Sequence, residues 1–244
     1  MLGGTLLLGA VIALGGSWRT VFLLLAGLAF VLVVLVSRYK FPAGQGEDGE
    51  TMSFMQSLRG AFEAMRRRDV LRWLVLLQFS DLMLDILLGF LALYFVDVAG
   101  KSEAEAGIAV AVWVGVGLLG DALLIPLLER VRGLAYLRVS AVLEGVLFIA
   151  LLLVEPLLLK LIILGAHGFF NAGWYSILQG QLYTAMPGQS GTVMAVGTVT
   201  GLVGSLVPLL IGLVAQQAGL GVAMWLLLAG PLALLVGLPR QPRT

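Results

Sequence analysis

Four acidic residues lie within long apolar stretches of this sequence, where an ionised side chain is costly. They are Asp81, Asp85, Asp121 and Glu144. A charged residue at the centre of a membrane-spanning helix costs about 2.5 to 3.5 kcal/mol on insertion scales, so each of these acids needs a physical reason. No Lys or Arg occurs at a matching depth in these stretches. A carboxylate without a counterion in a low dielectric can hold a proton near neutral pH, which suits a proton carrier or a pocket for a cationic substrate.

Asp81 and Asp85 form the most specific of these patterns. They are four residues apart, so a helix places both on one face, and Gln78 lies three residues before the first acid. We predict that these three residues bind a proton or a substrate. Helices outside this chain could instead supply an arginine partner, and the acids would then form a structural latch. Asp121 lies nearer the predicted cytoplasmic end of its helix and is a candidate gating residue, whereas Glu144 is an intramembrane acid of uncertain role.

A second polar face is predicted on the apolar stretch from 157 to 183. His167, Asn171, Trp174 and Tyr175 recur at three- and four-residue steps, so they share one face of a continuous helix. His and Asn inside a membrane either line a binding cavity or form hydrogen bonds that join neighbouring helices. Both interpretations stay open for His167, and we take all four residues as candidates for substrate binding or proton coupling.

The composition is that of an integral membrane protein. The chain has 244 residues, of which 60% are hydrophobic and 12% charged, and its mean hydropathy is +1.04. A soluble domain has about 25% charged residues. The chain has no Cys and one His, so disulfides and thiolate metal sites are excluded. No pattern indicates a metal site, a cofactor or a nucleic-acid surface, and we predict none of these.

Seven helices are predicted to cross the membrane, because about 20 apolar residues span the bilayer core. The apolar runs are long and do not alternate, which argues against a β-barrel. Residues 1–16 are apolar but short, and we interpret them as part of a further helix. The predicted spans are residues 20–37, 73–96, 106–128, 134–154, 157–183, 192–217 and 220–238.

The basic residues indicate how these helices are oriented. When the loops alternate between the two sides, twelve basic residues fall on the side of the polar segment 38–72 and three on the other. This asymmetry follows the positive-inside rule, so we predict that residues 38–72 and the C-terminus are cytoplasmic. The twelve are Arg38, Lys40, Arg59, Arg66, Arg67, Arg68, Arg72, Arg130, Arg132, Arg138, Arg240 and Arg243, and the three are Arg19, Lys101 and Lys160.

Four segments carry a likeness to a known family. Gly15-Gly16-Ser17-Trp18-Arg19-Thr20-Val21-Phe22 is similar to a turn between two transporter helices, and residues 38–72 are similar to a long loop between two six-helix halves. Glu129-Arg130-Val131-Arg132-Gly133 is similar to an acidic-basic-glycine loop motif, although Ile125 stands where a glycine is expected. Pro187-Gly188-Gln189-Ser190-Gly191-Thr192 precedes a glycine-rich helix. Together, these segments resemble the major facilitator superfamily.

The resemblance implies an all-α membrane protein with the helical bundle of that superfamily, from a partial fifth helix to the twelfth. Residues 1–37 would end the N-terminal half, 38–72 would be the cytoplasmic inter-half loop, 73–238 the C-terminal six-helix half and 239–244 a cytoplasmic tail. Helices one to four would come from a longer form of the chain or from another chain. The family lines its cavity with helices seven and ten, which carry the Asp pair and the His167 face, whereas its ninth helix, with Glu144, is usually peripheral.

The function implied is secondary active transport of a small molecule by alternating access, coupled to a proton or another ion, in a bacterial cytoplasmic membrane. Glu129, Arg130 and Arg132 would then be gating candidates, and the chain would not be an enzyme. Two alternatives remain. One is a non-transporting remnant or membrane scaffold half, because one half has no complete cavity. The other is an intramembrane aspartyl protease, but its Tyr-Asp and Gly-x-Gly-Asp motifs are absent, since Ser80 and Leu84 precede the first two acids and Leu118 replaces a glycine.

Overall fold

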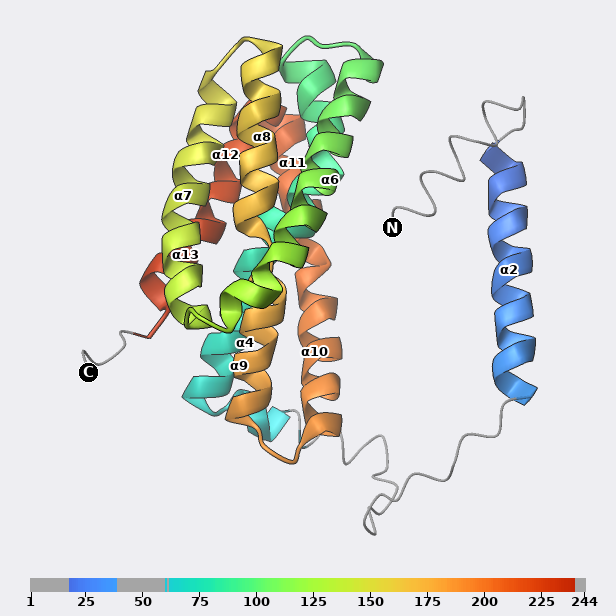
Figure 1. Ribbon diagram of the computed structural model, residues 1–244, viewed down its shortest axis with the longest axis vertical. Helices are drawn as coiled ribbons and strands as arrows, with labels where there is room; N and C mark the ends of the chain where they lie inside the picture. The colour runs from blue at the N-terminus through green and yellow to red at the C-terminus, as the bar shows by residue number, and fades with distance from the viewer. Residues whose placement is uncertain (1–17, 39–59, 61, 240–244) are drawn as a thin grey trace. The chain divides into compact units, whose positions relative to one another are not determined.

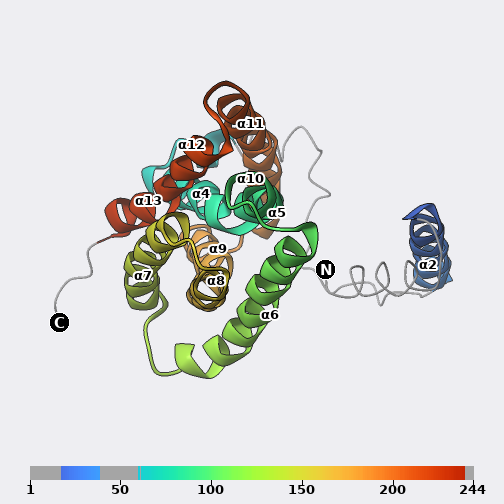
Figure 2. The same cartoon turned by 90° about the horizontal axis from the view of Figure 1, so that it is seen from above.

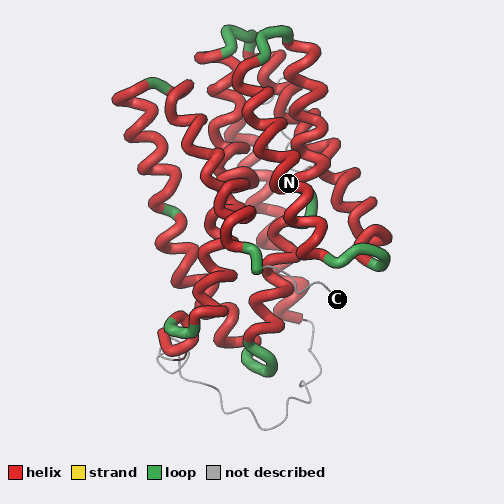
Figure 3. Tube along the Cα trace, turned by 90° about the vertical axis from the view of Figure 1, so that its left-hand side faces the viewer, coloured by secondary structure: helices red, strands yellow, loops and turns green. Residues whose placement is uncertain are grey.

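The computed structural model describes residues 18–38, 60 and 62–239, and every regular element in these ranges is helical (Figure 3). The chain divides into two compact units, Met1–Thr51 and Met52–Thr244. The first unit contains the apolar helix α2 (Trp18–Arg38), which has 21 residues and corresponds to the predicted span 20–37. The predicted partial helix 1–16, most of the predicted loop 38–72 and the tail 240–244 lie outside the described residues.

The second unit contains six helical segments that are long and apolar enough to cross a membrane, and they confirm the predicted spans from residue 73 onward. The largest difference is at the first segment, which begins at Arg68 instead of Trp73. Asp69 in its first turn favours the helix N-terminus, and arginine side chains at a membrane boundary can extend toward water. The six segments are Arg68–Val98, Glu103–Leu128, Gly133–Leu153, Leu157–Ala185, Ser190–Ala218 and Leu220–Gly237.

Two of the six segments are single uninterrupted α-helices, and the other four contain irregular turns. The continuous helices are α6 (Glu103–Leu128) and α7 (Gly133–Leu153). Figure 1 shows α8 stacked on α9, and α11 on α10, as the two parts of single spans. The interrupted segments comprise α4 (Arg68–Asp81), the π-helix η1 (Leu82–Ile86), α5 (Leu87–Leu93) and the π-helix η2 (Tyr94–Val98); α8 (Leu157–Asn171) and α9 (Trp174–Ala185); α10 (Ser190–Gly204) and α11 (Leu206–Ala218); and α12 (Leu220–Trp225), the 3-10 helix η3 (Leu226–Leu228) and α13 (Ala229–Gly237).

Local capping explains where several of these helices begin and end. Ser102 starts α6 with a capping box, in which its hydroxyl accepts the Glu105 N–H at 3.3 Å and Glu105 Oε2 accepts the Ser102 N–H at 2.8 Å. At the same end of the bundle, Lys160 is buried and donates from Nζ to Leu151 O at 2.6 Å and to Tyr94 Oη at 2.8 Å. The ammonium therefore caps the last turn of α7, where the helix dipole favours a cation.

The backbones of α6 and α8 approach each other closely. Viewed along the helices, α8 and α9 lie between α7, α6 and α4 (Figure 2). A Cβ at Gly168 would collide with the backbone oxygen of Trp113, and a Cβ at Gly120 would lie 2.8 Å from Phe169 O. Glycines therefore let the two backbones meet directly, as small residues do between membrane helices.

The span Ser190–Ala218 lies mostly on the surface of this unit. In the 18-residue stretch of this span that was assessed for membrane crossing, only 6% of the residues are buried, although the mean hydropathy is 2.1. Large apolar side chains such as Leu202, Leu206 and Leu209 are exposed along it. In a membrane, such a face contacts lipid or further helices.

Substitution of Gly168 by Ala tests the α6–α8 contact. We expect Gly168→Ala to destabilise the protein by about 1 to 3 kcal/mol, because the new methyl group would meet fixed backbone. The control is Gly115→Ala on α6, where nothing lies within 4 Å of the added Cβ and where Ala favours the helix. The measurement is the temperature at which the detergent-solubilised protein loses its monodisperse peak. Equal stability of the two variants would contradict the close contact.

Candidate functional site

The predicted Asp pair lies where the first span leaves α-helical geometry. Asp81 is the last residue of α4, and Asp85 lies within the π-helix η1. The side chain of Asp81 is partly buried and that of Asp85 is exposed. Gln78 Nε2 donates to Asp81 Oδ2 at 3.3 Å, so two of the three predicted residues are in direct contact. Single-turn π segments inside α-helices occur frequently at functional sites.

Gln78 also fixes the position of the next span. Its carboxamide occupies the space that a Cβ at Gly204 would need, so α4 and α10 touch at this point. Gln78 also lines a pocket of about 230 Å³, whose surface is almost entirely apolar. The glycines of the 192–217 stretch thus include at least one packing position, and that position carries the partner of Asp81. The pocket is lined by Met65, Leu71, Leu74, Val75, Gln78, Phe79, Thr200 and Val203.

The span that was predicted as one helix over 157–183 is broken near its middle. α8 ends at Asn171, α9 begins at Trp174, and Gly173 between them has φ +72°. A Cβ at Gly173 would collide with the side chain of Leu124, so Gly suits this position sterically as well as conformationally. The break frees backbone groups inside the membrane, and such groups need partners within the protein.

Two side chains from neighbouring helices bind the backbone groups of the break. Asp121 Oδ1, on α6, accepts the Gly173 N–H at 3.0 Å. The Tyr136 hydroxyl, on α7, lies 3.0 Å from Ala172 O and 3.2 Å from Phe170 O and donates to these carbonyls. The sequence singled out Asp121 as a gating candidate, and the structure shows its contact with the break. Tyr136 was not predicted, because nothing near it in the sequence marks its partner.

Asn171 connects the broken span to the π-helix that follows Asp81. Its Nδ2 donates to Met83 O at 2.6 Å, and the side chain is buried. Leu87 N–H donates to Leu82 O, five residues back, and therefore not to Met83 O, four residues back. Asn171 thus supplies a donor to a carbonyl that the π geometry leaves without its usual α-helical partner. This hydrogen bond joins the π-helix η1 to the break between α8 and α9.

Glu144 and His167 form a buried pair between α7 and α8. His167 Nδ1 lies 2.9 Å from Glu144 Oε2, and both side chains are 0% exposed. The two atoms are close, but neither side chain makes a hydrogen bond of good geometry with another described residue. The imidazole also packs edge-on against Trp113 and Phe148, at centroid distances of 6.4 and 5.9 Å. No spacing pattern in the sequence pairs Glu144 with His167, because they lie on different predicted helices.

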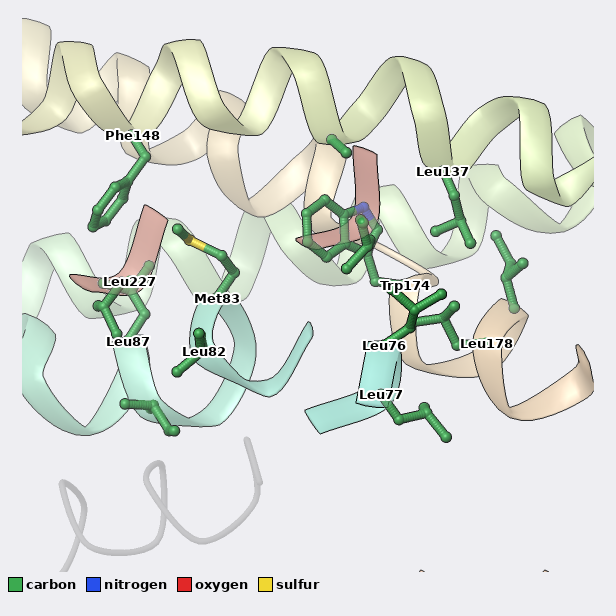
Figure 4. Packing of buried hydrophobic residues seen from close by; sticks show 14 of the residues in the cluster. Leu76, Leu77, Leu82, Met83, Leu87, Leu137, Phe148, Trp174, Leu178 and Leu227 are labelled. Atoms are coloured by element: carbon green, nitrogen blue, oxygen red, sulfur yellow. The ribbon is translucent and has the colours of Figure 1, made fainter. Parts of the chain in front are cut away.

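The predicted common face of His167, Asn171, Trp174 and Tyr175 is wrong. The first three are buried, whereas Tyr175 is 52% exposed. The break at residues 172–173 changes the helical register, so spacing across it no longer defines a face. Trp174 packs among the buried side chains that include Leu76 and Leu137 (Figure 4), and its Nε1 donates to Ser140 Oγ at 2.9 Å.

The other gating candidates lie at the surface. Glu129, Arg130 and Arg132 are exposed in the turn between α6 and α7, and Arg132 is the N-cap residue of α7. No ion pair joins them to Asp121 or to one another within the described residues. The part of the chain that the structure describes also holds no cluster of three or more His, Asp or Glu side chains that could bind a metal ion.

These features define a polytopic helical membrane protein that has acids within three of its spans and a hydrogen bond between the π-helix η1 and the α8–α9 break. The sequence profile of the Major Facilitator Superfamily matches residues 1–208. The chain therefore belongs to the Major Facilitator Superfamily.

One solved structure extends the comparison to the fold. The crystal structure of a variant of the E. coli fucose:proton symporter FucP matches with a TM-score of 0.65 and 20% sequence identity. The match covers 97% of this chain and 62% of that one, so the chain spans less than two thirds of the symporter's length. At this identity the likeness shows the fold alone. No curated protein matches the chain.

A double-mutant cycle tests the Glu144–His167 pair. We expect Glu144→Leu to destabilise the protein by about 3 to 5 kcal/mol, because it leaves His167 buried without its partner. Replacing both residues, as Glu144→Leu with His167→Phe, should cost less than the sum of the two single changes. The measurement is the free energy of unfolding from denaturant titration in detergent. Additive costs would show that the two side chains are not coupled.

Proposed function

We propose that this chain forms the C-terminal six-helix half, and part of the other half, of a proton-coupled secondary transporter that moves a small molecule by alternating access. The observation that carries the proposal is the position of Asp81 and Asp85. Two acids lie one turn apart within a membrane span, and no Lys or Arg among the described residues forms an ion pair with either. Adjacent carboxylates without a cation can exchange protons or hold a cationic substrate group.

The two interrupted spans support the same proposal. Secondary transporters typically build their binding sites from discontinuous helices near the middle of the bilayer, and they alternate access by movement of one half against the other. Here the Asp pair and the α8–α9 break lie on the two spans that Asn171 connects. The exposed apolar face of Ser190–Ala218 provides a surface for helices of the other half. Those helices would complete the cavity.

The protease alternative has no support in the geometry. An aspartyl protease needs two acids that face each other across one catalytic site. Asp121 instead accepts the Gly173 N–H and helps to hold the helix break. The scaffold alternative predicts that the complete assembly moves no solute, and the transport experiment below decides this point.

The test of the Asp pair distinguishes a role in proton coupling from a role in substrate binding. The complete transporter is reconstituted in proteoliposomes and supplied with a panel of hexoses, including the fucose moved by the structural neighbour, and of lipophilic amines. We expect Asp81→Asn with Asp85→Asn to reduce uptake driven by an imposed pH gradient to the level of protein-free liposomes. Exchange of substrate without a gradient should persist if the acids carry protons, and should also be lost if they bind the substrate.

The control for this experiment is Asp97→Asn. Asp97 lies near the end of the same span and is exposed, so its substitution removes one acid without touching the proposed site. It should keep gradient-driven uptake. Undiminished uptake in the Asp81 and Asp85 double variant would remove these residues from the mechanism, and the absence of any flux in the unmodified transporter would favour the scaffold alternative.

The proposed topology places residues 38–72 and the C-terminus in the cytoplasm. The natural chain has no Cys, so single-cysteine variants report one position each. In intact cells, a membrane-impermeant maleimide should label Lys101→Cys, and it should label Ser53→Cys and Thr244→Cys only after the membrane is permeabilised. Labelling that placed positions 53 and 244 on opposite sides would overturn the arrangement.

A further inference from the structure

An open groove runs between the first turns of α4 and the last turns of α13, at one boundary of the membrane span. It has a volume of about 440 Å³ and its lining is almost wholly apolar, so Arg68 and Arg72 line it mainly with the hydrocarbon parts of their side chains. The helices α4 and α13 pack closely at the base of the groove, because a Cβ at Gly237 would lie 2.6 Å from Leu76 Cδ2. The lining residues are Arg68, Leu71, Arg72, Val75 and Leu76 from α4, and Ala233, Val236 and Gly237 from α13.

The two arginines of the groove lie one helical turn apart on α4. Arg68 and Arg72 are both exposed, and neither forms an ion pair with another residue in the described part of the chain. Their neighbour Arg67 differs, since its Nη2 donates to Ala185 O at 3.0 Å and so ties α4 to the end of α9. Guanidinium groups bind phosphate oxygens through paired N–H donors. Arg68 and Arg72 are four residues apart and share one face of α4, an arrangement that suits recognition of a phosphate.

The walls below the arginines are suited to a hydrocarbon chain. Leu71 is 45% exposed, Val75 43% and Val236 88%, and all three lie on the groove lining. Arg68 begins the membrane span, so one turn of helix, about 5.4 Å, separates the boundary from the apolar side chains that follow. A phosphate at the arginines would thus sit at headgroup depth, with the apolar walls extending into the hydrocarbon. A soluble anion would use the arginines but would leave these walls uncovered.

We propose that this groove binds one anionic phospholipid, whose phosphodiester contacts Arg68 and Arg72 and whose acyl chain lies against Leu71, Val75 and Val236. Basic pockets between membrane helices recognise anionic headgroups in this way. The site lies between α4, which carries Asp81, and α13. It is independent of the proposed transport function, because the readout below is lipid retention and needs no substrate or gradient.

The test measures how much phosphatidylglycerol the complete chain retains. The protein is purified from nanodiscs that contain equal amounts of phosphatidylglycerol and phosphatidylcholine, and the retained lipids are counted by native mass spectrometry. We expect one phosphatidylglycerol per chain, with little phosphatidylcholine. Arg68→Gln with Arg72→Gln should weaken this retention about ten- to thirtyfold, the loss expected for two basic residues near an anionic surface. Both side chains are exposed, so the helices should remain folded.

Two controls separate the groove from general charge and from a simple anion site. Arg130→Gln with Arg132→Gln removes the same charge from an exposed turn and should leave retention unchanged. Val236→Trp fills the groove without changing the charge, and it should reduce retention of long-chain phosphatidylglycerol. Equal loss in the Arg130 and Arg132 variant would overturn the proposal. Displacement of the lipid by millimolar inorganic phosphate would also overturn it, since the site would then recognise the anion alone.

Discussion

A backbone group that leaves helical hydrogen bonding inside a bilayer must find a partner within the protein, and this constraint shapes the second unit of the chain. The π-helix after Asp81 and the break after Asn171 each release such groups. Asn171 Nδ2, Asp121 Oδ1 and the Tyr136 hydroxyl reach these groups from three different spans. These hydrogen bonds connect the π-helix η1 and the α8–α9 break to each other and to α6 and α7, so the two irregular segments are stabilised by the packing of their neighbours.

This connection explains why polar residues cluster around α8 and α9. Among the described residues, the buried polar side chains are Ser80, Ser140, Glu144, Lys160, His167 and Asn171. Most of them satisfy a backbone carbonyl or another polar side chain, as Lys160 does at Leu151 O and Ser140 does for Trp174 Nε1. Their first role is to let helices bend and end within an apolar environment. A role in transport is better argued from polar residues whose side chains are not already hydrogen-bonded to the backbone or to a structural partner.

The sequence predicted the spans well because hydropathy over about 20 residues is a property of the chain itself. It could not predict the interruptions with the same method. Gly173 was a signal, since a glycine in the middle of an apolar run often marks an irregular backbone, but His167 to Tyr175 was interpreted as one face because spacing alone assumes an unbroken helix. The pairing of Glu144 with His167 and of Asn171 with Met83 depends on how helices pack, and no local pattern encodes it.

The intramembrane acids differ in exposure: Glu144 is buried, whereas Asp81 and Asp85 are at least partly exposed. This difference bears on which of them is the better candidate for the proposed proton exchange. Glu144 is 0% exposed and contacts an equally buried His167, so the protein encloses both side chains. Asp85 is exposed on its span and Asp81 is partly exposed beside it. The proposed proton exchange needs a group that can be reached without unfolding, and the exposure of the Asp pair supports its choice over the buried pair. The same helix carries Gln78, whose amide bonds to Asp81 and packs against Gly204 of α10. Under the proposed function, a change in the charge of Asp81 would therefore act directly on the contact between α4 and α10, and so link protonation to a movement of one span against another.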